Sequence, residues 1–405
     1  MEERGCGPGV GPQPGQDARF VREALALAAN GLGLASPNPM VGAVIVADGE
    51  TVGRGWHEGP GTAHAEAMAL AGAGQRARGA TLYVTLEPCS HHGRTPPCAP
   101  AVVDAGIVRV VASTRDPNTV VDGRGFDILR RAGVEVKEGV LRDEAERLVA
   151  GFAKHVRTGL PLATLKMAAS LDGRVAARDG SARWITGPAA REDAHRLRAA
   201  SDAIVVGAGT AVVDDPALTV RLPGYRGRQP LRVVVDGRGS VQPRGSLFDG
   251  AAPTMVATTT AGADRGRAGW EAVGAEVVVV DEAGGTRVPL GRLMEVLGKR
   301  DVQSVLIEGG PTLAWSAIAE GIVDRLVLYL APKLIGGTAA PGVLGGAGID
   351  RVSDAIALTI DRVSMVGDDV KVEAGVQWGS SPSERSERRD LRTPWLVSDP
   401  SKTGR

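Results

Sequence analysis

Residues 64–98 read HAEAMALAGAGQRARGATLYVTLEPCSHHGRTPPC, and they hold three zinc-binding side chains within one short stretch. His64, Cys89 and Cys98 provide one imidazole and two thiolates, which suit a tetrahedral Zn²⁺ site whose fourth position stays open. A metal of this kind lowers the pKa of a bound water to about 7. The pattern therefore predicts a hydrolytic centre.

Glu66 is expected to be a proton carrier at this centre rather than a ligand. Residues two apart do not share a helix face, yet His64 and Glu66 can both reach a metal that lies beyond the helix N-terminus. Cys98 follows Pro96-Pro97, where another helix is expected to begin, and that position favours a thiolate. The alternative is a structural zinc site, but such sites are usually closed by four protein ligands and three are found here.

Strands and helices alternate around this centre, which indicates an α/β sheet covered on both faces. Asp17 is a candidate N-cap for a first helix that stops at Asn30-Gly31. The other helices and strands of this half are expected at Val41–Val46, Thr51–Gly53, 64–72, Leu82–Leu86, 98–105, Val108–Ala112, 126–132 and Val134–Lys137. A charged helix over Asp143–Arg157 closes a first domain expected over 17–157, after a disordered tail over 1–16.

The pattern restarts near Leu162 and predicts a second domain over 158–378. Its strands are expected at Leu162–Leu165, Ala203–Val206, Leu231–Asp236, Thr254–Ala257, Glu276–Asp281, Ser304–Ile307 and Leu326–Leu330. A closing hairpin over Arg362–Glu373 turns at Gly367-Asp368. Residues 379–405 are rich in Ser, Arg and Pro and are expected to form a second disordered tail.

Two glycine-containing loops of this half follow a strand and open a helix. They read GAGT at 207–210 and EGGPT at 308–312. At such a position glycine lets the backbone approach a phosphate, and the helix N-terminus supplies amide donors. The first loop lacks the third glycine of the dinucleotide-binding fingerprint, so a Rossmann domain is disfavoured.

The runs TLEPCSHHGRTPPCAPA (85–101) and NPMVGAVIV (38–46) carry a specific resemblance. They resemble the deaminase half of the bifunctional riboflavin-biosynthesis deaminase/reductase family, over residues 17 to about 155. The zinc deaminase signature H-x-E…P-C-x-x-C is present, except that eight residues (90–97) rather than two separate the cysteines. The resemblance implies a cytidine-deaminase-like three-layer domain in which Glu66 is catalytic and His64, Cys89 and Cys98 bind zinc.

Further polar residues of this half are candidates for substrate contact. Asn38 lies between two prolines, whose rigid backbone could aim its amide at a pyrimidine edge; a plain turn residue is the alternative. By resemblance, the insertion with His91, His92 and Arg94 helps to hold the substrate, and a solvated loop is the alternative. His57 could line the same pocket or lie on the surface.

The segments 164–221, IEGGPTL (307–313) and LYLAPKLIGG (328–337) resemble the reductase half of the same family, whose domain is similar to dihydrofolate reductase. The residues that the resemblance places against NADPH are Ala168, Trp184, Thr210, Asp214, Gly310, Pro311, Thr312, Leu313, Ala314, Trp315 and Ser316. Those that it places against the substrate are Arg198, Leu218, Arg221 and Glu308. Arginine suits a ribose phosphate because it binds phosphate bidentately.

Lys166 lies inside an expected strand of a chain with few lysines. It could hydrogen-bond the ribose of the substrate or donate a proton to it. A snorkelling lysine at the edge of a sheet is the alternative.

The resemblance implies two consecutive reactions and a homo-oligomer. The first is zinc-dependent hydrolytic deamination of 2,5-diamino-6-(5-phosphoribosylamino)pyrimidin-4(3H)-one. The second is reduction by NADPH of the ribosyl group of 5-amino-6-(5-phosphoribosylamino)uracil to the ribitylamino product. The expected partners are therefore small-molecule phosphoribosylaminopyrimidines.

Composition weighs against nucleic-acid and membrane partners. Lys+Arg and Asp+Glu both number 47, so the formal charge is zero. A nucleic-acid-editing zinc deaminase with an accessory nucleotide-binding domain would need a basic, aromatic-studded surface, and aromatic residues make up 3%. A third alternative is a non-enzymatic zinc module fused to a nucleotide-sensing domain.

Three features favour the cytoplasm as the place where the protein works. The chain has three cysteines, which cannot build a disulfide framework. Its N-terminus lacks the basic start and apolar stretch of a signal peptide. The sequence also has no run of about 18 apolar residues that could span a membrane.

Overall fold

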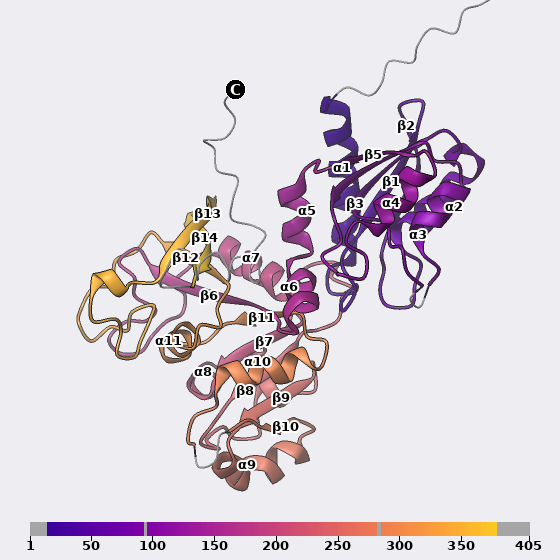
Figure 1. The fold of residues 1–405 in the computed structure, drawn as a ribbon. Helices are drawn as coiled ribbons and strands as arrows, with labels where there is room; N and C mark the ends of the chain where they lie inside the picture. The colour runs from indigo at the N-terminus through magenta and orange to yellow at the C-terminus, as the bar shows by residue number, and fades with distance from the viewer. Residues whose placement is uncertain (1–13, 93–94, 282–284, 379–405) are drawn as a thin grey trace, which may run out of the picture. The chain divides into compact units, whose positions relative to one another are not determined.

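The chain divides into two compact units between Ala150 and Gly151. The computed structural model describes residues 14–92, 95–281 and 285–378 (Figure 1). The tail expected over 379–405 and the part of the first tail over 1–13 lie outside the described residues, whereas residues 14–16 form the start of a helix. None of the helices in the described ranges combines the length and hydropathy that a bilayer crossing requires.

The first unit is built on a five-stranded sheet in the order β2-β1-β3-β4-β5. β1 pairs antiparallel with β2 and β3, while β3, β4 and β5 are parallel. In chain order the elements are α1 (Pro14–Ala28), β1 (Gly42–Ala47), β2 (Glu50–Trp56), α2 (Ala65–Ala73), β3 (Thr81–Leu86), α3 (Cys98–Asp104), β4 (Arg109–Thr114), α4 (Arg124–Arg131), β5 (Glu135–Glu138) and α5 (Arg142–Leu148). Apart from the helix expected over Asp143–Arg157, the expected strands and helices are confirmed, with ends that differ by a few residues.

Helices cover both faces of this sheet because side chains alternate along each strand. On one face, Phe20 of α1 packs in a buried cluster with Val44 and Tyr83. On the other face, Ile45 packs in a cluster with Ala69 of α2 and residues of α3 and α4. This arrangement is the three-layer α/β domain that the sequence predicts.

The structure corrects the prediction that Asp17 is an N-cap. α1 begins at Pro14, so Asp17 lies inside the helix with its side chain fully buried. Its carboxylate accepts hydrogen bonds from Tyr83 Oη at 3.1 Å, from Arg109 at 2.9 and 3.0 Å, and from Lys137 at 2.7 Å. Asp17 therefore ties α1 to β3, β4 and β5.

The second unit is built on a nine-stranded sheet in the order β10-β9-β8-β7-β11-β6-β12-β14-β13. The first seven strands in that order are parallel, and β14 and β13 add antiparallel to the edge. The strands are β6 (Leu162–Ser170), β7 (Ala203–Gly207), β8 (Leu231–Val235), β9 (Thr254–Thr258), β10 (Glu276–Val279), β11 (Ser304–Ile307), β12 (Arg325–Ala331), β13 (Ala357–Val366) and β14 (Asp369–Gln377). The expected hairpin turn at Gly367-Asp368 is confirmed.

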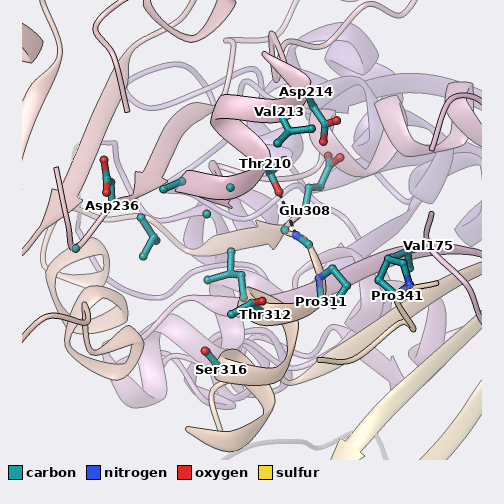
Figure 2. Close-up of a pocket in the computed structure, with 18 of the residues that line it drawn as sticks. Val175, Thr210, Val213, Asp214, Asp236, Glu308, Pro311, Thr312, Ser316 and Pro341 are labelled. Carbon is teal, nitrogen blue, oxygen red and sulfur yellow. Dashed lines mark hydrogen bonds between the residues drawn. The ribbon is translucent and has the colours of Figure 1, made fainter. Parts of the chain in front are cut away.

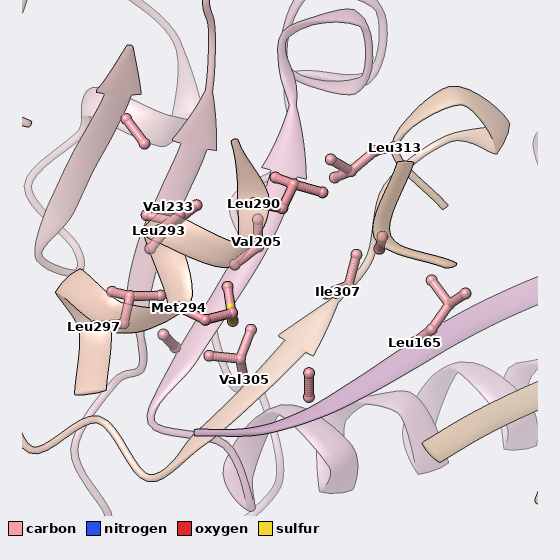
Figure 3. Close-up of a cluster of buried hydrophobic side chains, with 14 of the residues drawn as sticks. Leu165, Val205, Val233, Leu290, Leu293, Met294, Leu297, Val305, Ile307 and Leu313 are labelled. Atoms are coloured by element: carbon pink, nitrogen blue, oxygen red, sulfur yellow. The ribbon is translucent and has the colours of Figure 1, made fainter. Parts of the chain in front are cut away.

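Helices cover both faces of this sheet as well. They are α6 (Ala150–Thr158), α7 (Pro188–Ala199), α8 (Ala208–Asp214), α9 (Thr260–Ala272), α10 (Leu290–Gly298) and α11 (Pro311–Ala319). The largest core cluster lies where α10 and α11 meet the strands, and Figure 3 shows Leu293 and Met294 of α10 facing Val205 and Val305. Ile204 and Leu306 point to the opposite face, where they pack with residues of α7 and α8.

The helix expected over Asp143–Arg157 is two helices, α5 and α6, that separate at Val149. α6 packs on the second unit: Lys154 Nζ lies 2.5 Å from Asp324 Oδ2, and a Cβ on Gly151 would lie 3.1 Å from Gln303 O. The division at Ala150 therefore precedes the boundary expected at 157/158.

Candidate active sites

In the first unit, the ends of three elements bring three metal-binding side chains together. His64 directly precedes α2, Cys89 follows β3, and Cys98 is the first residue of α3. One ligand atom from each lies within 4.8 Å of the others. His64 Nδ1 is 3.5 Å from Cys89 Sγ and 3.3 Å from Cys98 Sγ. The structure thus assembles the expected ligand set.

Neighbouring residues fix the position of His64. Thr95 Oγ1 lies 3.1 Å from His64 Nε2, which leaves Nδ1 to face the two sulfur atoms. Gly53 and Gly55 of β2 let α2 lie directly on the strand, because a Cβ at these positions would come within 2.2 and 2.1 Å of carbonyl oxygens of α2. The glycines of β2 and the Thr95 hydroxyl were not singled out from the sequence.

The two thiols are electrostatically linked. Hydrogen bonds from Cys98 and His64 lower the pKa of Cys89 to about 4, and the bond to Cys89 raises the pKa of Cys98. The Cys98 backbone N–H also donates to Cys89 Sγ at 3.2 Å. One imidazole and two thiol groups, one of them readily ionised, form a donor set that fits Zn²⁺.

Glu66 lies in the first turn of α2 beside this set, and 4% of its surface is exposed. It is hydrogen-bonded to Cys98, and burial raises its pKa to about 7. The carboxyl group is therefore held next to the ligands and shielded from solvent, as a proton carrier requires.

Asn38 and His57 form a pair near the same centre. Asn38 Nδ2 lies 2.9 Å from His57 Nε2, while His57 Nδ1 lies 3.2 Å from Ala63 O. His57 is buried and meets the His64 ring edge-on, with ring centroids 5.4 Å apart. His91 and His92 are exposed, and Arg94 lies outside the described residues.

In the second unit, a pocket of about 860 Å³ opens at the carboxyl ends of parallel strands (Figure 2). The segments that follow β7, β8 and β11 all reach it, because the carboxyl ends of parallel strands meet at one edge of a sheet. Both glycine-containing loops, at 207–210 and 308–312, line it. Thr210 Oγ1 joins the two loops by accepting from Gly310 N at 3.2 Å.

The pocket contains most of the residues expected to contact the cofactor. The residues from that set that line it are Ala168, Thr210, Asp214, Gly310, Pro311, Thr312, Leu313 and Ser316. Two further residues of the set do not line the pocket: Ala314 belongs to the buried core, and Trp315 packs against it. Trp184 is 64% exposed and does not line the pocket, and it stacks near the guanidinium of Arg191.

Glu308 is the centre of a charged cluster on the pocket wall. Its carboxylate accepts two hydrogen bonds from Arg198, at 2.7 and 2.9 Å, and lies 3.7 Å from Lys166 Nζ. Burial acts to raise the pKa of Glu308, but the charges of Arg198 and Lys166 outweigh it and hold the pKa at about 2. Glu308 and Lys166 line the pocket.

The arginines expected to bind substrate phosphate differ in their surroundings. Arg198 is engaged with Glu308 and does not line the pocket, so its first role here is to hold that carboxylate. Arg221 is exposed, and its Nη1 lies 3.4 Å from Thr219 Oγ1. Leu218 does not line the pocket; it is buried in a core cluster with Ile204 and Ala211, and its φ of 50° is left-handed.

Family models match both units of the chain. The family of the cytidine and deoxycytidylate deaminase zinc-binding region matches residues 14–114, and the RibD C-terminal domain matches residues 161–372. The riboflavin biosynthesis protein RibD of Escherichia coli K12 is 43% identical over 366 residues, which cover 88% of this chain and 98% of that protein. The chain belongs to the RibD family. The RibD of Bacillus amyloliquefaciens is also 43% identical, over 88% of this chain and 95% of that protein.

Solved structures of RibD relatives share the fold over about nine-tenths of this chain. Acinetobacter baumannii RibD superposes with a TM-score of 0.79 at 37% identity, and covers 90% of this chain and 100% of its own. A diaminohydroxyphosphoribosylaminopyrimidine deaminase/5-amino-6-(5-phosphoribosylamino)uracil reductase of Thermotoga maritima gives 0.79 at 35% identity, over 89% of this chain and 99% of its own.

RibD membership makes this chain a bifunctional deaminase and reductase of riboflavin biosynthesis. Its cofactors are Zn²⁺ and NADPH. The nucleic-acid-editing alternative is not favoured.

Part of the RibD pocket was missed by the sequence reasoning. The additional lining segments lie at 175–182, 235–240 and 286–290. A signal existed for the second of these, because Asp236-Gly237 directly follows the expected strand Leu231–Asp236 at the edge where ligands bind in parallel sheets. The other two segments follow no comparable pattern.

Proposed function

We propose that the first unit deaminates 2,5-diamino-6-(5-phosphoribosylamino)pyrimidin-4(3H)-one. The observation that carries this proposal is the buried Glu66 beside His64, Cys89 and Cys98 in a chain of the RibD family. The Thermotoga maritima relative, 35% identical, bears the name of the same deaminase reaction.

His64, Cys89 and Cys98 would hold the metal, and bound zinc supplies the Lewis acidity that activates a water molecule. Glu66 would accept one proton from that water and deliver it to the pyrimidine ring nitrogen; it would then take the proton of the hydroxyl group added to the ring carbon and pass it to the amino group, which leaves as ammonia. Asn38 orients the pyrimidine edge, and its hydrogen bond to His57 fixes the direction of its amide.

The second unit is proposed to reduce the ribosyl group of 5-amino-6-(5-phosphoribosylamino)uracil. The residues that line the pocket would hold NADPH, whose bound form would supply a hydride for C1 of the ribosyl group in its ring-opened imine form. Lys166 and Glu308 contact the opened ribose, and Arg198 keeps Glu308 ionised and oriented. Arg221, which is exposed and not paired with a carboxylate in the described structure, is the better candidate for the substrate phosphate.

The proposal also covers the oligomeric state of the protein and the cellular compartment in which it works. We infer a homo-oligomer in the cytoplasm. Exposed apolar side chains on the edge strand β13, such as Ile360 and Met365, support a surface that another copy covers. A reducing compartment keeps Cys89 and Cys98 available as metal ligands.

The test of the deaminase assignment is the variant Glu66→Gln with Glu50→Gln, an exposed surface residue, as its control. We expect ammonia release to fall by at least about 100-fold in Glu66→Gln, while zinc content by elemental analysis stays equal to that of the parent. Unchanged ammonia release, or loss of zinc together with activity, would remove Glu66 from the role of proton carrier.

A further inference from the structure

His195 is a half-buried histidine of α7 that contacts the segment 219–221. Its Nδ1 accepts a hydrogen bond from the backbone N–H of Arg221 at 3.3 Å. Arg198 lies three residues further along α7, on the same side of the helix, and its Nη1 donates to Thr219 O at 3.3 Å. α7 therefore holds this segment at two points, and the one at Arg221 depends on an imidazole.

The residue between these two points is held separately. Val220 N donates to Gln229 Oε1 at 2.7 Å, and Gln229 Nε2 donates to Val220 O at 3.2 Å. The bond to His195 thus acts on the backbone of Arg221 itself, at the end of the held segment. The side chain of Arg221 is exposed, and a fixed backbone lowers the entropic cost of placing such a long side chain on an oxyanion.

The hydrogen bond from Arg221 requires a neutral imidazole. Nδ1 can accept only while it carries no proton, and the proton of the neutral ring is then on Nε2. Burial lowers the pKa of His195 below its ordinary value of about 6.5, and the charges of Arg198 and Arg221 lower it further. The neutral form, which can accept from Arg221, therefore predominates at pH 7.

Two groups near the ring act in the opposite direction. The charge of Glu308 and a hydrogen bond with the Thr219 backbone raise the pKa of His195, but the downward causes outweigh them. Glu308 already accepts two hydrogen bonds from Arg198, which offsets its charge. The charged groups that act on the imidazole are thus two arginines and one paired carboxylate, and they favour the neutral ring.

We propose that neutral His195 positions Arg221 for the substrate phosphate, and that protonation of His195 releases Arg221 and weakens substrate binding to the second unit. The proposal rests on the proposed function, which assigns Arg221 to that phosphate. His195 acts through Arg221 and is therefore a positioning residue. Its hydrogen bond is complete above the pKa of His195 and is lost as the pH falls through that value. Substrate affinity should fall with it, whereas NADPH, which would be held by pocket residues that include neither His195 nor Arg221, should bind as before.

The test is the pH dependence of reductase kinetics in the full chain. KM for the deaminated uracil compound, KM for NADPH and kcat are measured from about pH 5 to 8, the range in which histidine changes charge. The variants are His195→Leu, which removes the acceptor, and His195→Asn, whose amide oxygen can replace Nδ1 but does not titrate. Arg221→Gln gives the effect of losing the positioned side chain. Glu192→Gln, exposed on the same helix and paired with Arg196, is the matched control.

At neutral pH we expect His195→Leu to raise KM for the uracil compound about three- to tenfold, because one hydrogen bond changes an equilibrium by roughly that factor. KM for NADPH and kcat should stay unchanged, and His195→Asn and the control should match the parent. Toward acid pH, KM of the parent should rise relative to that of His195→Asn by a similar factor. This ratio cancels the ionisation of the substrate phosphate, whose second pKa is about 6.

A ratio of parent to His195→Asn that stays constant with pH, or a KM of His195→Leu equal to that of the parent, would overturn the proposal and leave the proposed function intact. An unchanged KM in Arg221→Gln would remove Arg221 from the phosphate, and this proposal with it. A parent chain that does not reduce the uracil compound would overturn the proposed function itself.

Discussion

Asp17 and Glu308 are buried carboxylates that stay ionised because cations lie within hydrogen-bond distance. Arg109 and Lys137 face Asp17, and Arg198 faces Glu308. Burial alone would raise each pKa, but these cations outweigh it and bring both values to about 2. The pairing of a buried carboxylate with cations stabilises the first unit at Asp17. In the second unit it holds Glu308 in the wall of the pocket.

Asp17 should make the stability of the first unit depend on pH. Its pKa is about 2 in the folded chain and about 3.9 when unfolded, so its contribution of about 2–3 kcal/mol is complete above pH 4. It is lost as the pH falls from about 4 to 2. We expect Asp17→Asn to lower the unfolding temperature at pH 7 and to converge with the parent near pH 2.

Scanning calorimetry between pH 2 and 7 measures this difference. Asp104→Asn, at the exposed end of α3, is the control and should follow the parent throughout. A difference between Asp17→Asn and the parent that stays constant with pH would show that the carboxylate charge is not what stabilises α1.

At the scale of elements, Glu87 connects the zinc-binding loop to the segment before α4. It follows β3 directly and is 3% exposed. Its carboxylate accepts from the backbone N–H groups of Asp116 at 3.2 Å, Gly123 at 2.9 Å and Gly125 at 2.8 Å. Cys89 lies two residues further on, so Glu87 fixes the start of the loop that carries a metal ligand.

Glu87→Ala should weaken zinc binding as well as stability. The substitution leaves three buried amides without their acceptor, at a cost of roughly 1–3 kcal/mol each. We expect a lower unfolding temperature and a weaker zinc affinity in competition with a chromophoric chelator. Glu144→Ala, exposed on α5, is the control. A variant that loses stability but binds zinc like the parent would refute the link to Cys89.

Most elements could be predicted from the sequence because buried strands read as apolar runs and glycines mark their ends. The predictions were wrong where contacts between residues far apart in the chain determine the local structure. Asp17 has the residue type of an N-cap, but three partners far along the chain hold it inside α1. The break at Val149 separates two helices because α6 packs on Asp324 of the second unit, which local sequence does not reveal.

In the candidate sites, too, local sequence patterns could be predicted and contacts between distant residues could not. The grouping of His64, Cys89 and Cys98 could be predicted because chemistry restricts zinc ligands to a few residue types at marked spacings. The partnership of Arg198 with Glu308 could not, since the two residues are far apart in the chain and any one arginine resembles another. The segments at 175–182 and 286–290 line the pocket because the order of the strands in the folded sheet brings them there. Their own sequences do not reveal this position.

At the scale of the whole molecule, one chain carries two sites, each built within its own unit. The zinc ligands and Glu66 precede the division at Ala150, and every residue of the reductase pocket follows it. Chelation of the metal should therefore stop the first reaction and spare the second. The product of the first reaction is the proposed substrate of the second, so the two activities must appear in a fixed order.

The most direct measurement is one time course on the zinc-loaded chain with the diaminopyrimidine ribose phosphate and NADPH, in which ammonia release and NADPH oxidation are followed together. The account predicts that ammonia appears first, that NADPH oxidation follows after a lag, and that both approach the same molar amount. With chelated protein and the deaminated uracil compound, NADPH oxidation should persist. NADPH oxidation that precedes ammonia, or no ammonia from zinc-loaded protein, would contradict the account.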